Sequence, residues 1–257
     1  MEWLAVTSLK RSGSKHAPER KGAIPLPLHS TNKRGSFIMR DLSKIKLGIA
    51  LPNVQDTYPS HFVDSFCQIT KPSHLYLKPD GGGPIDAVRN SLILKAMAVE
   101  CTHIWMTDTD QVYPQDVLMR LLEHDLDIVA AKVHKRYPPY DPILLRGTLE
   151  HFDEVPDHEW AVDDGQLIEV DATGFGSVLI NMEVFEKIDR PWFNFDLSHP
   201  GGPVGEDIGF YTKARAAGFR VFVDCSIKIG HLVRLIVNEE SYFAYKDVKN
   251  GKSGIKL

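Results

Sequence analysis

The chain has 257 residues, of which 43% are hydrophobic and 25% are charged. This composition is typical of a globular protein with a substantial core, and it excludes a disordered or collagen-like chain. No apolar run approaches the roughly 20 residues of a bilayer-spanning helix, and the first residues do not resemble a secretory signal. The three cysteines lie far apart in the sequence, so we expect reduced thiols in a cytoplasmic protein.

The net charge of −4 is unevenly distributed along the chain. Residues 1–40 contain eight Lys/Arg and two Asp/Glu, which leaves 22 and 32 for the rest, a balance of +6 against −10. We therefore expect a flexible basic tail over residues 1–40, or sequence that precedes a natural start at Met39, and one domain over residues 41–257. Because this domain is acidic, nucleic acid is not an expected partner, whereas a cation held between carboxylates and an anionic substrate suits the charge.

Strands and helices alternate from residue 44 onward. Apolar runs predict buried strands, and apolar residues at steps of three and four predict an amphipathic helix from Ile85 to Val99. The other predicted elements of this half are strands at 46–51, 75–77, 102–107 and 127–133, a helix around 60–70, and a helix that Pro114 opens. The alternation indicates right-handed crossovers and an α/β domain with a mostly parallel central sheet flanked by helices.

The second half of the chain is less regular. Residues 134–165 are rich in proline and acidic residues and predict a long connection that contains a hairpin. After it we expect a strand at 178–180, a short helix at 182–189, a helix at 206–218 that ends at Gly218, and a strand at 220–224.

The clearest chemical signal is Asp108-Thr109-Asp110, directly after the predicted strand 102–107. In extended backbone, two carboxylates at this spacing point to the same side of the sheet. They also follow the carboxyl end of a parallel strand, where open α/β sheets bind ligands, and hard oxygen ligands suit Mg²⁺ or Mn²⁺. The alternative is a solvated turn whose aspartates cap the next helix.

Four weaker signals each have a structural alternative. Arg89 either recognises an anion or forms a surface ion pair on its own helix. Glu206 and Asp207 are either ordinary partners of a helix dipole or contain a base, which then requires an influence that opposes the dipole. His231 is either a metal ligand or a structural histidine, and Gly174 either lets a substrate approach the backbone or belongs to a plain turn.

The order of these features resembles the GT-A glycosyltransferases, in particular the family 2-like nucleotide-sugar enzymes. The resemblance covers about residues 45–235 and rests on the following sequence: a strand that ends at Pro52-Asn53, a helix with Arg89, the Asp108-Thr109-Asp110 motif, a turn with Gly174, the Glu206-Asp207 pair, and His231. It implies a single-domain GT-A fold and a hexosyltransferase-like enzyme that moves a sugar from a nucleoside-diphosphate-sugar to an acceptor hydroxyl, with Mn²⁺ or Mg²⁺ as cofactor.

The resemblance also implies roles for individual residues. Asp110 and His231 match the metal ligands, and Asp108 matches a carboxylate that reaches the donor's ribose or a metal-bound water. Asp207 matches the catalytic base of inverting members, and its neighbour Glu206 lies near the acceptor.

The donor-binding residues implied by the resemblance are Pro52, Asn53, Asp80, Arg89 and Gly174. Pro52 and Asn53 match positions beside the nucleotide base and ribose. Asp80 belongs to a turn, Lys78–Gly83, that departs from the acidic uridine-binding turn of many relatives. UDP-sugars and GDP-sugars therefore both stay open as donors, as do the sugar, the acceptor and the oligomeric state.

Three other functions stay open. A nucleotidyltransferase shares such a sheet, but it typically carries a glycine-rich loop with an arginine after the first strand, where this chain has Pro52–Tyr58. A non-catalytic nucleotide-sugar-binding module predicts binding without turnover. An enzyme that modifies nucleic acid is supported by the basic tail alone.

Overall fold

The computed structural model describes residues 41–161, 166–234 and 236–250, which all belong to the unit Arg40–Leu257. The predicted basic tail of residues 1–40, with the alternative start at Met39, lies outside the described residues.

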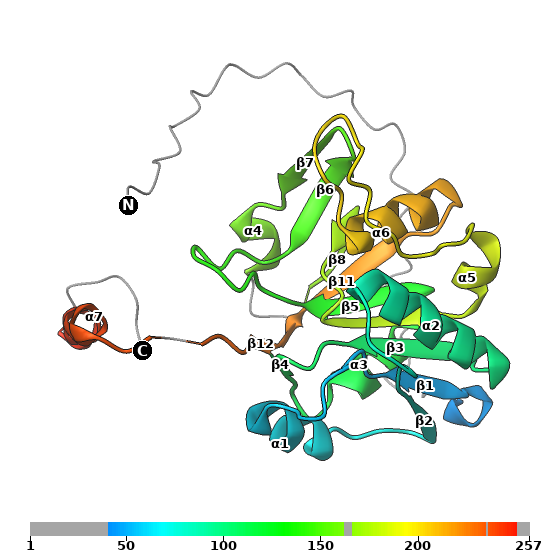
Figure 1. Ribbon diagram of the computed structural model, residues 1–257, viewed down its shortest axis with the longest axis horizontal. Helices are drawn as coiled ribbons and strands as arrows, with labels where there is room; N and C mark the ends of the chain where they lie inside the picture. The colour runs from blue at the N-terminus through cyan, green and yellow to red at the C-terminus, as the bar shows by residue number, and fades with distance from the viewer. Residues whose placement is uncertain (1–40, 162–165, 235, 251–257) are drawn as a thin grey trace, which may run out of the picture. The chain divides into compact units, whose positions relative to one another are not determined.

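A seven-stranded sheet with the order β2-β1-β3-β10-β5-β11-β8 lies at the centre of this unit (Figure 1). Its strands are β1 (Leu47–Ala50), β2 (His74–Leu77), β3 (His103–Thr107), β5 (Ile128–Lys132), β8 (Leu167–Val170), β10 (Ser177–Asn181) and β11 (Val221–Lys228). Strands β2, β1, β3, β5 and β11 run in one direction, and β10 and β8 run in the other. The predicted α/β class with a mostly parallel sheet is confirmed.

Strand β10 is antiparallel to both of its neighbours, β3 and β5. Its residues Val178, Leu179 and Ile180 are fully buried because side chains cover both faces of the sheet. The register pairs Ser177 with Thr107, so the turn that precedes β10 lies beside the residues that follow β3. An apolar run predicts such a strand but does not reveal its direction.

Helices cover both faces of the sheet and bury two separate core clusters. One cluster lies under α2 (Ile85–Ala98), α5 (Glu183–Lys187) and α6 (Glu206–Ala216), and the other lies under α1 (Ser60–Gln68) and α3 (Val117–Glu123). Alternate side chains of β3 enter opposite clusters: Ile104 and Met106 face α2, whereas Trp105 packs with α1 and α3. The result is a three-layer domain.

Two small sheets extend from this centre. Strands β4 (Gln111–Val112) and β12 (Gly230–His231) pair with each other, and β6 (Leu144–Thr148) pairs with β7 (His151–Glu154) and β9 (Ala172–Thr173). The antiparallel pair β6–β7 confirms the hairpin predicted within 134–165. The remaining elements are the 3₁₀ helix η1 (Leu42–Lys44) and the helices α4 (Asp157–Trp160) and α7 (Glu239–Lys249).

The predicted elements are confirmed with small shifts of their ends, and one helix start is wrong. Helix α3 begins at Val117, and Pro114 lies in the turn before it, where its carbonyl accepts the Val117 N–H at 3.2 Å. Helix α6 ends at Ala216, and Gly218 follows with a φ of 93°, which is the left-handed backbone expected after a helix. None of the helices in the described residues combines the length and apolar character needed to cross a membrane.

Candidate functional site

The predicted site residues gather at the edge of the sheet where the parallel strands end. Residues 108–110 follow β3, and residues 52–53 follow β1. The turn before β10 comes to the same edge, because the reversed β10 begins where β3 ends. The first turn of α6 lies there too, since Arg89 joins Glu206 to Asp108. This edge is where open α/β sheets bind ligands.

The buried hydroxyl of Tyr113 holds the backbone after β3. It lies 2.8 Å from the Asp108 carbonyl oxygen, 2.7 Å from the Gly176 carbonyl oxygen and 3.0 Å from the Asp108 amide nitrogen. The chain therefore turns at Thr109 and Asp110 instead of staying extended. The prediction that the two carboxylates share one side of the sheet assumed extended backbone, and that assumption is wrong because residues 109 and 110 form a turn. The two carboxylates contact different partners.

Asp110 lies against His231, which is 121 positions away in the sequence, with 3.3 Å between Oδ2 and Nε2. The β4–β12 pair creates this contact, since His231 pairs with Gln111 and the Leu232 N–H donates to the Asp110 carbonyl at 2.7 Å. On its other side, the His231 ring donates from Nδ1 to the His134 carbonyl at 2.8 Å. The guanidinium of Arg136 contacts both residues, donating to Asp110 Oδ2 and lying 3.3 Å from His231 Nε2.

The charges of this group shift the pKa values of both partners. Burial acts to raise the pKa of Asp110, but the hydrogen bond and charge of His231 and the charge of Arg136 outweigh it, so the pKa lies below its ordinary value. The hydrogen bond to Asp110 raises the pKa of His231, against the opposing effect of burial. Asp110 is therefore an anion that attracts cations.

Asp108 belongs to a second group, centred on the buried side chain of Arg89. The guanidinium donates to Asp108 Oδ1 at 3.0 Å and to Glu206 Oε1 at 3.1 Å, and it lies 4.8 Å from the centre of the Phe175 ring. Arg89 is 5% exposed, so two carboxylates compensate its buried charge. The ion pair expected on the helix itself is absent from the ion pairs of the described residues; Arg89 joins α2 to β3 and α6 instead.

Asp207 lies beside this group in the first turn of α6. Its Oδ1 accepts the Ile208 N–H at 2.8 Å. Burial raises its pKa, despite that hydrogen bond and the charge of Arg89. Burial likewise raises the pKa of Glu206. A base at a helix N-terminus needs an effect that opposes the helix dipole, because the dipole lowers its pKa. Burial of these carboxylates provides that effect.

The loops after β1 and β2 line an open cavity of about 350 Å³. Asn53 lines one side and Asp80 the other, so two predicted donor-binding residues share one cavity. Pro52 follows Leu51, whose N–H donates to the Leu77 carbonyl at 2.9 Å and thereby continues the pairing of β1 with β2. The remaining lining residues are Val54, Gln55, Asp56, Tyr58, Lys78, Pro79, Gly81 and Gly82.

Gly174 makes room for protein side chains. A Cβ at this position would lie 2.9 Å from Val133 Cγ2 and 3.1 Å from Ile143 Cδ1. The space beside its α-carbon is thus filled by the core, and a contact of Gly174 with the donor remains a prediction.

The residues at hand fit a divalent cation at Asp110 and His231. The described residues contain no cluster of three His, Cys, Asp or Glu side chains arranged to hold a metal, so the chain offers two ligands here. Mg²⁺ and Mn²⁺ accept few protein ligands when phosphates and water complete the shell. The hydrogen bond from His231 Nδ1 to the His134 carbonyl also leaves Nε2 on the side of Asp110, as in many metal-ligating histidines.

Two residues of the site carry no distinctive signal in the sequence. Tyr113 resembles any core aromatic until its three polar contacts are seen, and Arg136 lies in a proline-rich connection without periodicity. Only the nearness of Tyr113 to the aspartate motif distinguishes it in the sequence.

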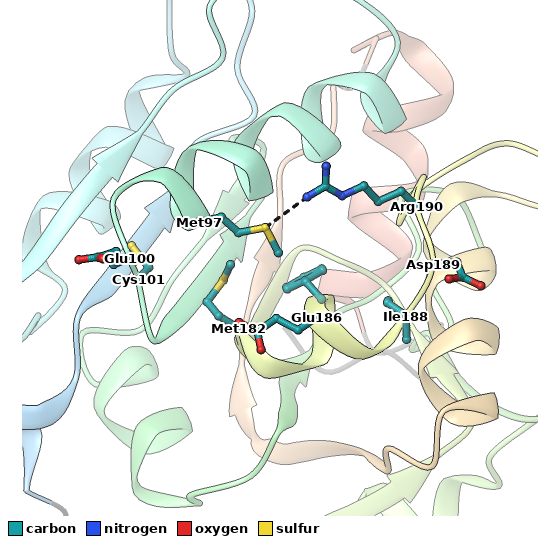
Figure 2. Close-up of a pocket in the computed structure, with 9 residues that line it drawn as sticks. Met97, Glu100, Cys101, Met182, Glu186, Ile188, Asp189 and Arg190 are labelled. Atoms are coloured by element: carbon teal, nitrogen blue, oxygen red, sulfur yellow. Dashed lines mark hydrogen bonds between the residues drawn. The ribbon is translucent and has the colours of Figure 1, made fainter.

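A larger cavity, of about 710 Å³, lies away from the predicted site residues (Figure 2). It is lined by the end of α2, the residues before β3 and the segment around α5, which together include Met97, Cys101 and Met182. Arg190 lies across it, with 3.8 Å between its guanidinium and Met97 Sδ (Figure 2). These residues flank the amino ends of the parallel strands, so the cavity is separate from the site.

No protein-family model matches the chain, and no curated protein matches it. Among solved structures, A197 from STIV is similar with a TM-score of 0.51 and 16% identity, over 74% of this chain and 86% of that one. GalNAc-T7 with UDP, GalNAc and Mn²⁺ is similar with a TM-score of 0.50 and 12% identity, over 74% of this chain and 43% of that one. GalNAc-T7 is a glycosyltransferase of GT-A type. At such identities the likeness concerns the fold, and this α/β domain has a GT-A-like fold.

Proposed function

We propose that the chain is a metal-dependent glycosyltransferase, which moves a sugar from a nucleoside-diphosphate-sugar to an acceptor hydroxyl. The observation that carries the proposal is the contact between Asp110 and His231, from distant parts of the chain, at the ligand-binding edge of a GT-A-like sheet. The presence of UDP and Mn²⁺ in the GalNAc-T7 structure supports the same chemistry.

The donor extends from the cavity between the β1 and β2 loops toward Asp110. Pro52, Asn53 and Asp80 surround the nucleotide, which is that of a UDP-sugar or a GDP-sugar. Asp110 and His231 hold Mn²⁺ or Mg²⁺, and Asp108 interacts with the ribose or with a water on the metal. A divalent cation held there would supply the positive charge that stabilises a leaving diphosphate.

Asp207 acts as the base, and the sugar is transferred with inversion. A base at this position removes the proton of an acceptor hydroxyl aligned behind the anomeric carbon. Its raised pKa brings the carboxylate closer to the basicity that proton removal requires. Glu206 is held by Arg89 and lies next to Asp207, on the acceptor side of the site.

A thermal-shift screen of UDP-sugars and GDP-sugars, with and without Mn²⁺, tests the donor and the metal together. We expect one nucleotide to stabilise the protein when Mn²⁺ is present, and Asp110→Asn to lose this effect because it removes a charged ligand. Asp153→Asn is the matched control, since Asp153 also pairs with a histidine, His151, at 3.0 Å but lies on the exposed β7. Equal donor binding by Asp110→Asn and the wild type would contradict the metal assignment.

Turnover of the donor that binds separates an enzyme from a binding module. We expect Asp207→Asn to retain donor binding and to lower the transfer rate by a factor of about 10²–10⁴, the usual contribution of a general base. Product analysis by NMR then gives the anomeric configuration. If Asp207→Asn and the wild type release sugar at the same rate, Asp207 is not the base.

A further inference from the structure

Arg136 occupies the place that the proposed function gives to the metal. Its guanidinium donates to Oδ2 of Asp110 and lies 3.3 Å from Nε2 of His231, the two atoms that face each other across the candidate metal site. Because His231 donates from Nδ1 to the His134 carbonyl, Nε2 is the ring atom that faces both Asp110 and Arg136. The arginine thus lies against the same two groups that a divalent cation would contact.

The connection that carries Arg136 allows its side chain to move without disturbing the core. The backbone before Arg136 is fixed, since His134 bridges to Pro142 and the Lys135 N–H donates to the Asp141 carbonyl at 2.9 Å. After Arg136, the Tyr140 N–H donates to the Tyr137 carbonyl at 2.9 Å and closes a turn. The side chain of Arg136 itself is 48% exposed. A long, half-exposed side chain on a fixed backbone exchanges partners by rotation of its own bonds.

We propose that Arg136 is an exchangeable internal cation, which neutralises Asp110 beside His231 in the free protein and transfers to the donor diphosphate when the metal enters. This inference rests on the proposed function. A guanidinium and a divalent ion at the same carboxylate oxygen repel each other, so metal entry favours the departure of Arg136. The diphosphate provides the new partner, because a guanidinium matches phosphate oxygens in fork geometry.

This exchange predicts a coupling between metal and nucleotide. The metal alone competes with Arg136 and binds weakly, whereas the metal with a nucleoside diphosphate releases Arg136 to a better partner. Each ligand therefore raises the affinity of the other, and part of the coupling passes through Arg136.

Mn²⁺ titrations of the full chain, followed by electron paramagnetic resonance at one pH, measure this coupling. They are performed with Mn²⁺ alone and with Mn²⁺ in the presence of UDP or of GDP. For Arg136→Gln we expect binding of Mn²⁺ alone about tenfold tighter than in the wild type, the effect of removing one competing charged hydrogen bond. The factor by which the nucleotide tightens Mn²⁺ binding is expected to shrink in the same variant.

Two further variants make the result specific to Arg136. Lys135→Gln removes a neighbouring charge that pairs with Asp141 and Glu154 and does not contact Asp110, so it should leave both Mn²⁺ affinities unchanged. Arg136→Lys keeps the charge but loses the fork, so it should resemble the wild type with Mn²⁺ alone and lose part of the nucleotide effect.

The outcomes distinguish this inference from the proposed function. If nucleotide tightens Mn²⁺ binding equally in the wild type and in Arg136→Gln, and Mn²⁺ alone binds both equally, the exchange is refuted and the proposed function stands. If neither protein binds Mn²⁺ under any of these conditions, the metal assignment and the exchange both fail.

Discussion

The hydroxyl of Tyr113 fixes the position of both aspartates of the motif. It contacts the amide and the carbonyl of Asp108 and the carbonyl of Gly176, and Asp110 follows on the same turn. In Tyr113→Phe these backbone groups lose their partner in a buried place, which costs about 1–3 kcal/mol of unfolding free energy. We also expect weaker Mn²⁺ binding, because the turn that presents Asp110 is less well fixed.

Urea denaturation and Mn²⁺ titration together check this expectation for Tyr113. Tyr242→Phe is a suitable control, since Tyr242 lies on α7 with a 52% exposed side chain. Unchanged Mn²⁺ affinity in Tyr113→Phe, combined with reduced stability, would restrict Tyr113 to a role in folding.

At the scale of elements, Asp224 ties β11 to the end of α3. Its carboxylate is 5% exposed, lies 2.9 Å from His124 Nε2 and 3.4 Å from the Arg120 guanidinium, and accepts the Ser226 N–H at 2.9 Å. Burial acts to raise its pKa, but the hydrogen bonds from His124 and Ser226 and the charge of Arg120 outweigh burial, so the pKa lies below the ordinary value of 3.8. The pair therefore stabilises the fold in its ionised form.

The lowered pKa of Asp224 predicts a pH-dependent stability. A carboxylate with a depressed pKa in the folded state contributes its full stability above the unfolded-state pKa, and this contribution is lost as the pH falls through the lower, folded-state value. We expect Asp224→Asn to lower the unfolding free energy by about 3 kcal/mol at neutral pH, because it leaves buried partners without their charge. The difference from the wild type should shrink below about pH 4.

Urea denaturation at a series of pH values measures this difference. Asp116→Asn is the matched control, since Asp116 pairs with the same Arg120 at 3.9 Å but is 61% exposed, and it should change stability far less. A difference between Asp224→Asn and the wild type that stays constant down to acid pH would contradict the account.

At the scale of the whole molecule, local sequence patterns predict where the strands and helices lie better than they predict which of them pack together. Apolar runs locate β1, β3 and β5 because burial on both faces demands them. The direction of β10 depends on pairing with β3 across some 70 residues of chain, which no local pattern records. The same holds for the site. The sequence predicts the Asp108–Asp110 motif and His231 as site residues. Arg136 is recognised only in the structure, where the fold brings it within 3.3 Å of His231, which is 95 positions away in the sequence.

The turn at Asp110 illustrates why the side-chain contacts of the site could not be predicted from the sequence. Spacing in extended backbone predicts two carboxylates on the same side of the sheet. In the structure the backbone turns at residues 109 and 110, where the Tyr113 hydroxyl contacts the Asp108 carbonyl, and Arg89 pairs with Asp108 whereas Arg136 pairs with Asp110. Arg89 faces Asp108 and Glu206, and its expected place beside the nucleotide stays a prediction.

The reversed strand at the middle of the sheet also constrains how the chain is made. Until residues 177–181 leave the ribosome, β3 and β5 each present an unpaired edge, since β10 supplies the missing backbone partners of both. Open edges of this kind recruit strands from other chains. A fragment that stops before Ser177 therefore has an incomplete sheet and is prone to aggregate. Neither half of the chain can form the central sheet without the other.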